Sequence, residues 1–148
     1  MKTEPNYTIS FTVEQTPEQV FAAINNVRGW WSGEIVGITD RLGAEFTYRV
    51  PNVHYTKQRI TTLVPGRKVM WHVVEADLTF VKDTGEWKGT DIVFEIAKQG
   101  QKTELRFTHR GLMQSNECYD KCSNAWDALV NGNLRNLILT GKTQPSPW

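Results

Sequence analysis

Apolar and polar side chains alternate through most of this sequence. The first instance is residues 7–13, YTISFTV, in which Tyr7 and every second residue after it are aromatic or aliphatic. This period of two predicts a strand with one buried face. The same pattern predicts six later strands: two within 34–50 separated by the turn cluster TDRLG, one each in 53–64 and 67–78, and a hairpin of 90–97 and 102–109 with Gly100 at its tip.

A short helix is predicted directly after the first strand. Thr16 can cap it, and Gln19 completes a capping box with Thr16. Pro17 suits the first helical position because its missing N–H would have no partner there. We expect this helix to end near Asn25 or Asn26.

The last third of the chain has the period of a longer helix. From about Asn116 to Leu139, apolar side chains recur at spacings of three and four, which predicts an amphipathic helix. Ser115 or Asn116 can cap it, Glu117 suits the positive end of its dipole, and Gly141 suits its C-terminal cap. The predicted buried stripe is Tyr119, Cys122, Trp126, Leu129, Val130, Leu134, Leu137 and Ile138.

The predicted order of elements is therefore strand, helix, six strands and a long helix. No internal repeat or linker interrupts it, so we expect residues 1–148 to form one α+β domain. Strands joined by short turns favour one antiparallel sheet, and the long helix is the obvious cover for its apolar face. A sheet wrapped around one helix tends to leave a cavity between them, which is a common kind of ligand site.

Composition narrows the function classes. Hydrophobic residues make up 39% and charged residues 22% of the chain, as in ordinary globular proteins. The net charge of +1, with dispersed basic residues, argues against nucleic-acid binding. No segment approaches the roughly 20 apolar residues of a membrane span. The opening MKTEPNYTIS contains no apolar signal core, so we expect a cytoplasmic protein whose thiols are reduced.

The two cysteines, Cys118 and Cys122, stand four residues apart on the predicted long helix. Structural zinc sites usually use C-x2-C with a second ligand pair, and thioredoxin-like redox pairs also use C-x-x-C. A disulfide between residues i and i+4 of an intact helix has poor geometry. Packing is the favoured interpretation of Cys122, and a pocket-lining thiol or metal or redox chemistry are the alternatives.

The three histidines are scattered through the predicted strands. His54 begins a strand, so we expect it to be exposed, and His72 lies in the opposite register from Trp71. His109 shares a face with Phe107, so it is expected on the covered side of the sheet. There it is either a hydrogen-bonded structural group or a polar anchor or acid–base group in a pocket. No second ligand lies at metal-binding spacing, so we expect no metal site.

Aromatic residues are the remaining candidates for a binding site. The segment 27–33, VRGWWSG, is expected to form an irregular or short helical corner. Its two tryptophans are either both structural, or one lies in the core and the other at a pocket mouth or the surface, where it could gate a ligand. Trp87 is expected at a loop tip, where aromatic residues are often functional. Cavity-wall candidates at alternating strand positions are Phe46, Tyr48, Trp71, Phe94 and Ile96.

Motifs of common catalytic centres are missing. The sequence has no G-x-S-x-G elbow, no nucleophile with an identifiable base, no Walker loop and no G-x-G-x-x-G. We therefore expect no catalytic residue and no cofactor.

Four stretches carry a resemblance to a known family: FAAINNVRGWWSGEIVGITDRLGAEFTYR (21–49), EWKGTDIVFEI (86–96), RFTHRGL (106–112) and ECYDKCSNAWDALVNGNLRNLILTGKTQP (117–145). They resemble the START-like or SRPBCC superfamily, in the branch similar to the activator of heat-shock-chaperone ATPase. The resemblance implies the helix-grip fold, with a curved seven-stranded antiparallel sheet around the C-terminal helix and two short helices after the first strand. It implies no single reaction, because function does not follow from fold.

Three functions are compatible with this resemblance. The favoured hypothesis is binding of a small hydrophobic or amphipathic ligand, such as a lipid, between sheet and helix. Its expected ligand-binding residues are Trp31, Phe46, Tyr48, Trp71, Trp87, Phe94, His109, Cys122 and Trp126. The alternatives are a polyketide-cyclase-like enzyme using His109, Tyr48 and Glu75, and a chaperone regulator acting by protein contact. We expect a bacterial protein that is a monomer or weak dimer.

Overall fold

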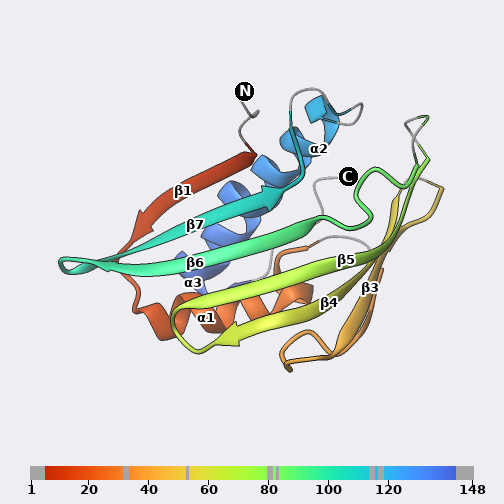
Figure 1. Cartoon of the computed structure of the whole chain (residues 1–148). Helices are drawn as coiled ribbons and strands as arrows, with labels where there is room; N and C mark the ends of the chain where they lie inside the picture. The colour runs from red at the N-terminus through yellow and green to blue at the C-terminus, as the bar shows by residue number, and fades with distance from the viewer. Residues whose placement is uncertain are drawn as a thin grey trace, which may run out of the picture.

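The computed structural model describes residues 6–31, 34–52, 54–79, 82, 84–113, 116 and 119–142. Seven strands form a single curved antiparallel sheet in the order β1-β7-β6-β5-β4-β3-β2. The strands are β1 (Tyr7–Val13), β2 (Glu34–Gly37), β3 (Glu45–Val50), β4 (His54–Val64), β5 (Lys68–Leu78), β6 (Asp91–Gln99) and β7 (Lys102–Arg110). Figure 1 shows the helices gathered on one face of the sheet. The predicted α+β helix-grip architecture is confirmed.

The first helix, α1 (Pro17–Asn25), begins at the predicted capping box. The Gln19 N–H donates to Thr16 Oγ1 at 3.1 Å, and the Thr16 N–H donates to Gln19 Oε1 at 2.9 Å. These bonds satisfy donors that the first helical turn leaves free. A short 3-10 helix, η1 (Val27–Gly29), follows, so the two short helices after the first strand are present.

The long C-terminal helix runs through residues 119–140 in three parts. An α-helical start, α2 (Tyr119–Trp126), is followed by a π-helical middle, η2 (Asp127–Leu134), and an α-helical end, α3 (Arg135–Thr140). The regular helix expected from the sequence is thus widened at its centre. Gly141 ends it in the left-handed conformation, with φ of 75°, as predicted. Ser115, Glu117 and Cys118 lie outside the described residues, and Asn116 Oδ1 accepts from the Met113 N–H at 2.9 Å.

The core lies between the sheet and the helices. The long helix buries seven residues of the predicted stripe: Cys122, Trp126, Leu129, Val130, Leu134, Leu137 and Ile138. Tyr119, the eighth, is partly buried against the same cluster. Alternate residues of the strands meet this stripe, which is why the period of two and the period of three to four appear in one sequence.

Candidate functional site

Tryptophan rings fill much of the space between sheet and helix. The sequence leaves open whether one of Trp30 and Trp31 lies at a pocket mouth or both are structural; both are buried and their rings stack, with centroids 6.0 Å apart. Trp31 also lies parallel to Trp71 at 5.7 Å. The 3-10 turn before them redirects the chain inward, and Trp30 Nε1 donates to the Ile24 carbonyl at 3.1 Å. Adjacent tryptophans can therefore both belong to the core when a turn precedes them.

One small cavity lies inside this aromatic layer, with a volume of about 30 Å³. This is close to the volume that one water molecule occupies in the liquid. A larger ligand therefore needs side chains to move. The lining residues are Trp31, Tyr48, His54, Trp87, Ala125, Trp126 and Leu129.

Trp87 forms one wall of this cavity. The sequence predicts a loop-tip residue, yet the ring is only 5% exposed, because the loop after β5 folds it inward. Its plane is parallel to that of Trp126, at 5.5 Å and 8°. The rings of His54 and His109 meet it edge-on, at 5.0 Å and 4.6 Å. The buried indole Nε1 of Trp87 has no hydrogen-bond partner in the described part of the chain.

A chain of hydrogen bonds fixes His109 next to Trp87. Trp126 Nε1 can only donate, so the 3.0 Å bond to His109 Nδ1 makes that nitrogen an acceptor. The proton of the neutral ring is then on Nε2, which donates to Thr90 Oγ1 at 2.8 Å. The Thr90 hydroxyl donates in turn to the Trp87 carbonyl at 2.5 Å. Burial, with a smaller effect from His54, lowers the pKa of His109 to about 3, which keeps the ring neutral.

His54 lines the cavity, although the sequence prediction placed it on the surface. Its ring is partly buried, contacts Tyr48 at 5.0 Å and lines the cavity. Burial lowers the pKa of His54 to about 4. A signal for this position exists in the sequence, because His54 is in the same alternating register as the buried Thr56, Gln58 and Ile60.

Buried polar atoms continue from the cavity along β4. Thr56 Oγ1 lies 3.4 Å from His54 Nε2 and accepts from Gln58 Nε2. Gln58 Oε1 and Trp71 Nε1 are buried without partners in the described residues. The inner face of the sheet is therefore apolar in bulk but carries hydrogen-bonding capacity that is not used.

Glu75, which the enzyme hypothesis placed inside, is on the outer surface. It is exposed and accepts from the Tyr55 hydroxyl at 3.2 Å. Alternation from Trp71 and Val73 predicts an inward side chain, but the pairing of β4 and β5 shifts register between Lys57 and Gln58. A bulge of this kind inserts one residue and reverses the orientation of the side chains beyond it. Of the three groups proposed for catalysis, Tyr48 alone lines the cavity.

The nine predicted ligand-binding residues are all buried, at 5% exposure or less. Trp31, Tyr48, Trp87 and Trp126 line the cavity, and His109 lies directly behind Trp87 and Trp126. Phe46, Trp71 and Phe94 form the aromatic layer further along the sheet. Cys122 is a buried free thiol, and Cys118 lies outside the described residues. Within the described residues, no group of three His, Cys, Asp or Glu side chains could hold a metal ion.

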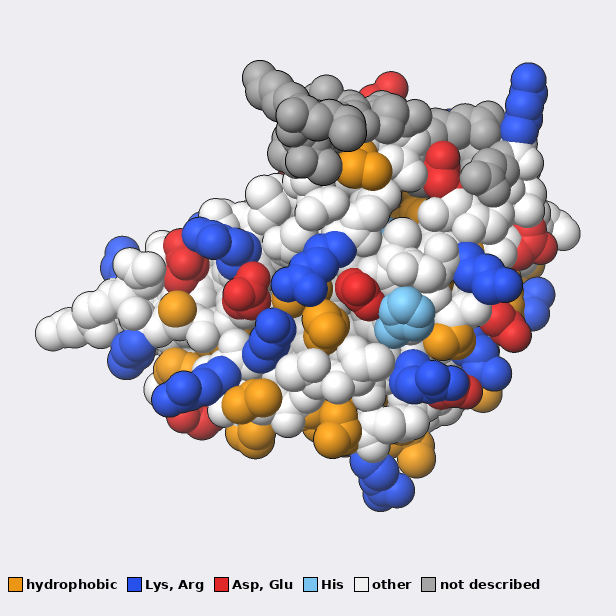
Figure 2. Space-filling view, in the orientation of Figure 1, with side chains coloured by type: hydrophobic (Ala, Val, Ile, Leu, Met, Phe, Trp, Pro, Cys, Tyr) orange, Lys and Arg blue, Asp and Glu red, His pale blue; other side chains and the backbone are white. Residues whose placement is uncertain are grey.

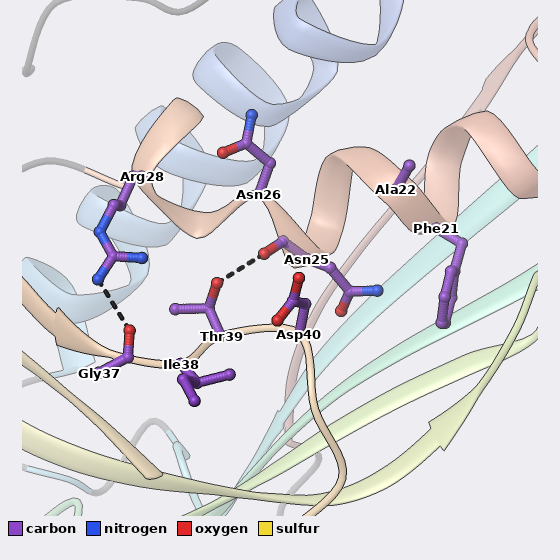
Figure 3. Close-up of a pocket in the computed structure, with 9 residues that line it drawn as sticks. All are labelled: Phe21, Ala22, Asn25, Asn26, Arg28, Gly37, Ile38, Thr39 and Asp40. Carbon is purple, nitrogen blue, oxygen red and sulfur yellow. Dashed lines mark hydrogen bonds between the residues drawn. The ribbon is translucent and has the colours of Figure 1, made fainter. Parts of the chain in front are cut away.

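A larger hollow of about 730 Å³ lies on the surface, between α1 and the segment that follows β2 (Figure 3). Two of its polar side chains bond to backbone, whereas the buried Asn25 Oδ1 has no partner in the described residues. Thr39 Oγ1 donates to the Asn25 carbonyl at 2.8 Å, and the Arg28 guanidinium donates to the carbonyls of Ile35 and Gly37. These bonds tie β2 to η1 and the segment after β2 to α1.

The match to known families is consistent with this geometry. The family model described as Activator of Hsp90 ATPase homolog 1-like protein matches residues 14–138. The chain belongs to this family. The matched range includes the whole aromatic layer and nearly all of the long helix. A search of curated proteins finds no match.

Solved structures of low sequence identity share the fold of this family member. The Aha1 dimer from Colwellia psychrerythraea is 22% identical, with a TM-score of 0.65 over 86% of this chain and 98% of the other. A protein from Bacillus halodurans is 16% identical, with a TM-score of 0.67 over 90% and 96%. CalU16 from Micromonospora echinospora is 15% identical, with a TM-score of 0.62 over 90% and 74%. Among the described residues, no helix is both long and apolar enough to cross a membrane.

Proposed function

We propose that this chain binds a small, largely apolar ligand between the sheet and the C-terminal helix, at the end marked by Trp87. The observation that carries this proposal is the set of buried polar groups around the 30 Å³ cavity. A buried donor without a partner costs stability, and a core selected only for packing would avoid it. The Trp87 N–H is such a donor, and the neutral His54 ring adds a further polar group to the same wall.

The helix geometry supports the same location. The π-helical segment η2 begins at Asp127, directly after Trp126, and contributes Leu129 to the cavity wall. π-helical turns are rare, and where they occur they are frequent at functional sites. The widened helix thus coincides with the polar end of the interior.

A role for His109 in binding is favoured over a role in catalysis by its hydrogen bonds. Both ring nitrogens of His109 are occupied, by Trp126 and by Thr90. A general base needs a free nitrogen within hydrogen-bond reach of the substrate. His109 therefore serves to hold the Trp87 loop and the helix in register with the sheet.

The proposal is tested by screening neutral aromatics, fatty acids and polyketides by thermal shift and native mass spectrometry. A pair of helix variants locates the site. Ala125→Leu adds three carbons to a residue that lines the cavity, while Ala128→Leu adds the same atoms to a similarly half-buried residue outside it. We expect ligands to raise Tm in the wild type and in Ala128→Leu but not in Ala125→Leu. The proposal is wrong if no compound binds, or if binding is unchanged in Ala125→Leu.

A further inference from the structure

The indole of Trp87 occupies a flat slot that is built like a binding site. One wall is the ring of Trp126, parallel to Trp87 within 8°. The rings of His54 and His109 also contact Trp87 and stand nearly perpendicular to it, at 82° and 89°. Offset stacking and edge-to-face contacts are the arrangements that aromatic rings prefer. The slot therefore fits a planar aromatic ring, and at present Trp87 supplies that ring.

Trp87 is an imperfect occupant of this slot. Its Nε1–H is buried and finds no acceptor in the described residues, as is also true of Trp71, whereas the Nε1 groups of Trp126 and Trp30 donate to His109 and to Ile24. The side chain belongs to the turn between β5 and β6, not to a strand or to the long helix. Its removal would join the volume of an indole to the 30 Å³ cavity beside it.

The slot offers no partner for a charged ligand. The cavity-lining residues that the structure describes include no Lys, Arg, Asp or Glu. Both histidines are neutral at physiological pH, because burial lowers the pKa of His54 to about 4 and that of His109 to about 3. An ionised group without a counter-charge is strongly disfavoured in such surroundings.

Building on the proposed function, we infer that Trp87 is a replaceable plug, and that the ligand is an uncharged planar aromatic molecule that takes its place. Such a ligand stacks on Trp126 and directs a hydroxyl or carbonyl group toward His54. The hydrogen-bond chain from Trp126 through His109 to Thr90 stays intact, because it involves the backbone carbonyl of Trp87 and not its ring.

The test uses three probes that differ in one property each. 2-Naphthol is planar and neutral, 2-naphthoate has the same rings but is anionic at pH 7, and decahydro-2-naphthol is neutral but not planar. Each is titrated into the wild-type chain while the Trp87 indole N–H resonance, assigned with Trp87→Phe, is followed for shift and for exchange with water. We expect 2-naphthol to bind at least tenfold tighter than either control and to accelerate exchange of the Trp87 N–H.

A variant then separates the plug from the pocket. In Trp87→Ala the slot is already vacant, so 2-naphthol no longer competes with an internal ring, and we expect its Kd to fall at least tenfold. If this variant does not fold, the exchange measurement on the wild type decides. If 2-naphthol binds while the Trp87 N–H stays protected from exchange, the inference that the ligand displaces Trp87 is wrong, but the proposed function still stands. Equal binding of 2-naphthoate overturns the ligand class. Failure of every probe and of the wider ligand screen overturns both.

Discussion

The two faces of the sheet use polar side chains in opposite ways. On the outer face, five strands place charged or ionisable groups in one row by register: Glu45, Arg59, His72, Asp91 and Arg110. Figure 2 shows acidic and basic side chains interspersed over this face. On the inner face, the polar groups are buried among tryptophans. Polar groups outside can exchange partners with water, whereas those inside depend on the one partner that packing provides.

The largest expected effect comes from removing the ring that joins the inner face to the helix. Trp126→Ala deletes the stack with Trp87, the contact with Phe107 at 4.7 Å and the hydrogen bond to His109 Nδ1. Truncation of a buried aromatic side chain typically costs about 3–5 kcal/mol. Urea denaturation should show a loss of this size in the free energy of unfolding. A loss below about 1 kcal/mol would mean that the aromatic layer rearranges around the gap.

The next effect is a dependence of stability on pH. The folded state holds His109 with a pKa of about 3, against 6.5 for the free side chain. Below pH 6.5 the His109 ring is therefore protonated in the unfolded chain but stays neutral in the folded chain. The free energy of unfolding is thus unaffected by this group above pH 6.5 and decreases as the pH drops toward 3. The slope for one such group is about 1.4 kcal/mol per pH unit.

Comparison with a His109 variant separates the contribution of His109 to the pH dependence of stability from that of the carboxylates. His109→Gln retains an acceptor for Trp126 but does not titrate. Urea denaturation at pH 7, 6, 5 and 4 should show the wild type losing stability more steeply than the variant. Parallel curves would contradict the neutral, buried state of His109.

A third substitution is expected to raise the free energy of unfolding, by a smaller amount. Thr56 and Gln58 bond to each other inside the core, and Gln58 Oε1 has no partner in the described residues. Replacing both partners of a buried pair by apolar groups of similar shape is often neutral or stabilising. The double variant Thr56→Val, Gln58→Met should gain up to about 1 kcal/mol in unfolding free energy. Stabilisation together with weaker ligand binding would show that these polar groups are kept for the ligand.

The sequence predicts those structural features that depend on residues close together in the chain. The capping box of Thr16 and Gln19, the bounds of β1 and the αL glycine after the long helix follow from local patterns and are confirmed. The buried stripe of the helix follows from its period. The family resemblance supplies the curved sheet around the C-terminal helix, and the order of the strands in that sheet comes from the structure.

What the sequence does not predict depends on partners distant in the chain. Glu75 is turned outward by a bulge that exists only once β5 pairs with β4. Trp87 is drawn inward by rings from β4, β7 and α2, which no local pattern brings together. The 30 Å³ cavity is the space that many side chains from several elements leave unfilled, so no single stretch of sequence predicts it. His54 is different, because its alternation with Ile60 correctly indicates the inner face of the sheet. The prediction that it is exposed rested instead on its place at the start of a strand.

The smallest change in stability is expected from a substitution on the outer face of the sheet. Arg59 donates to Glu45 Oε2 from Nε at 2.9 Å and from Nη2 at 2.6 Å, and these bonds hold the pKa of Glu45 below its usual value. Arg59→Gln removes the charge but leaves Lys57, 3.5 Å from Glu45 Oε1. Exposed ion pairs contribute little to stability and are screened by salt. Any loss in the free energy of unfolding should therefore be small at low ionic strength and disappear in about 0.5 M NaCl, where the Debye length is about 4 Å. A carboxyl NMR titration should show the pKa of Glu45 rising toward its ordinary value. A salt-independent loss as large as that of Trp126→Ala would mean that the outer row supports the fold as strongly as the aromatic layer does.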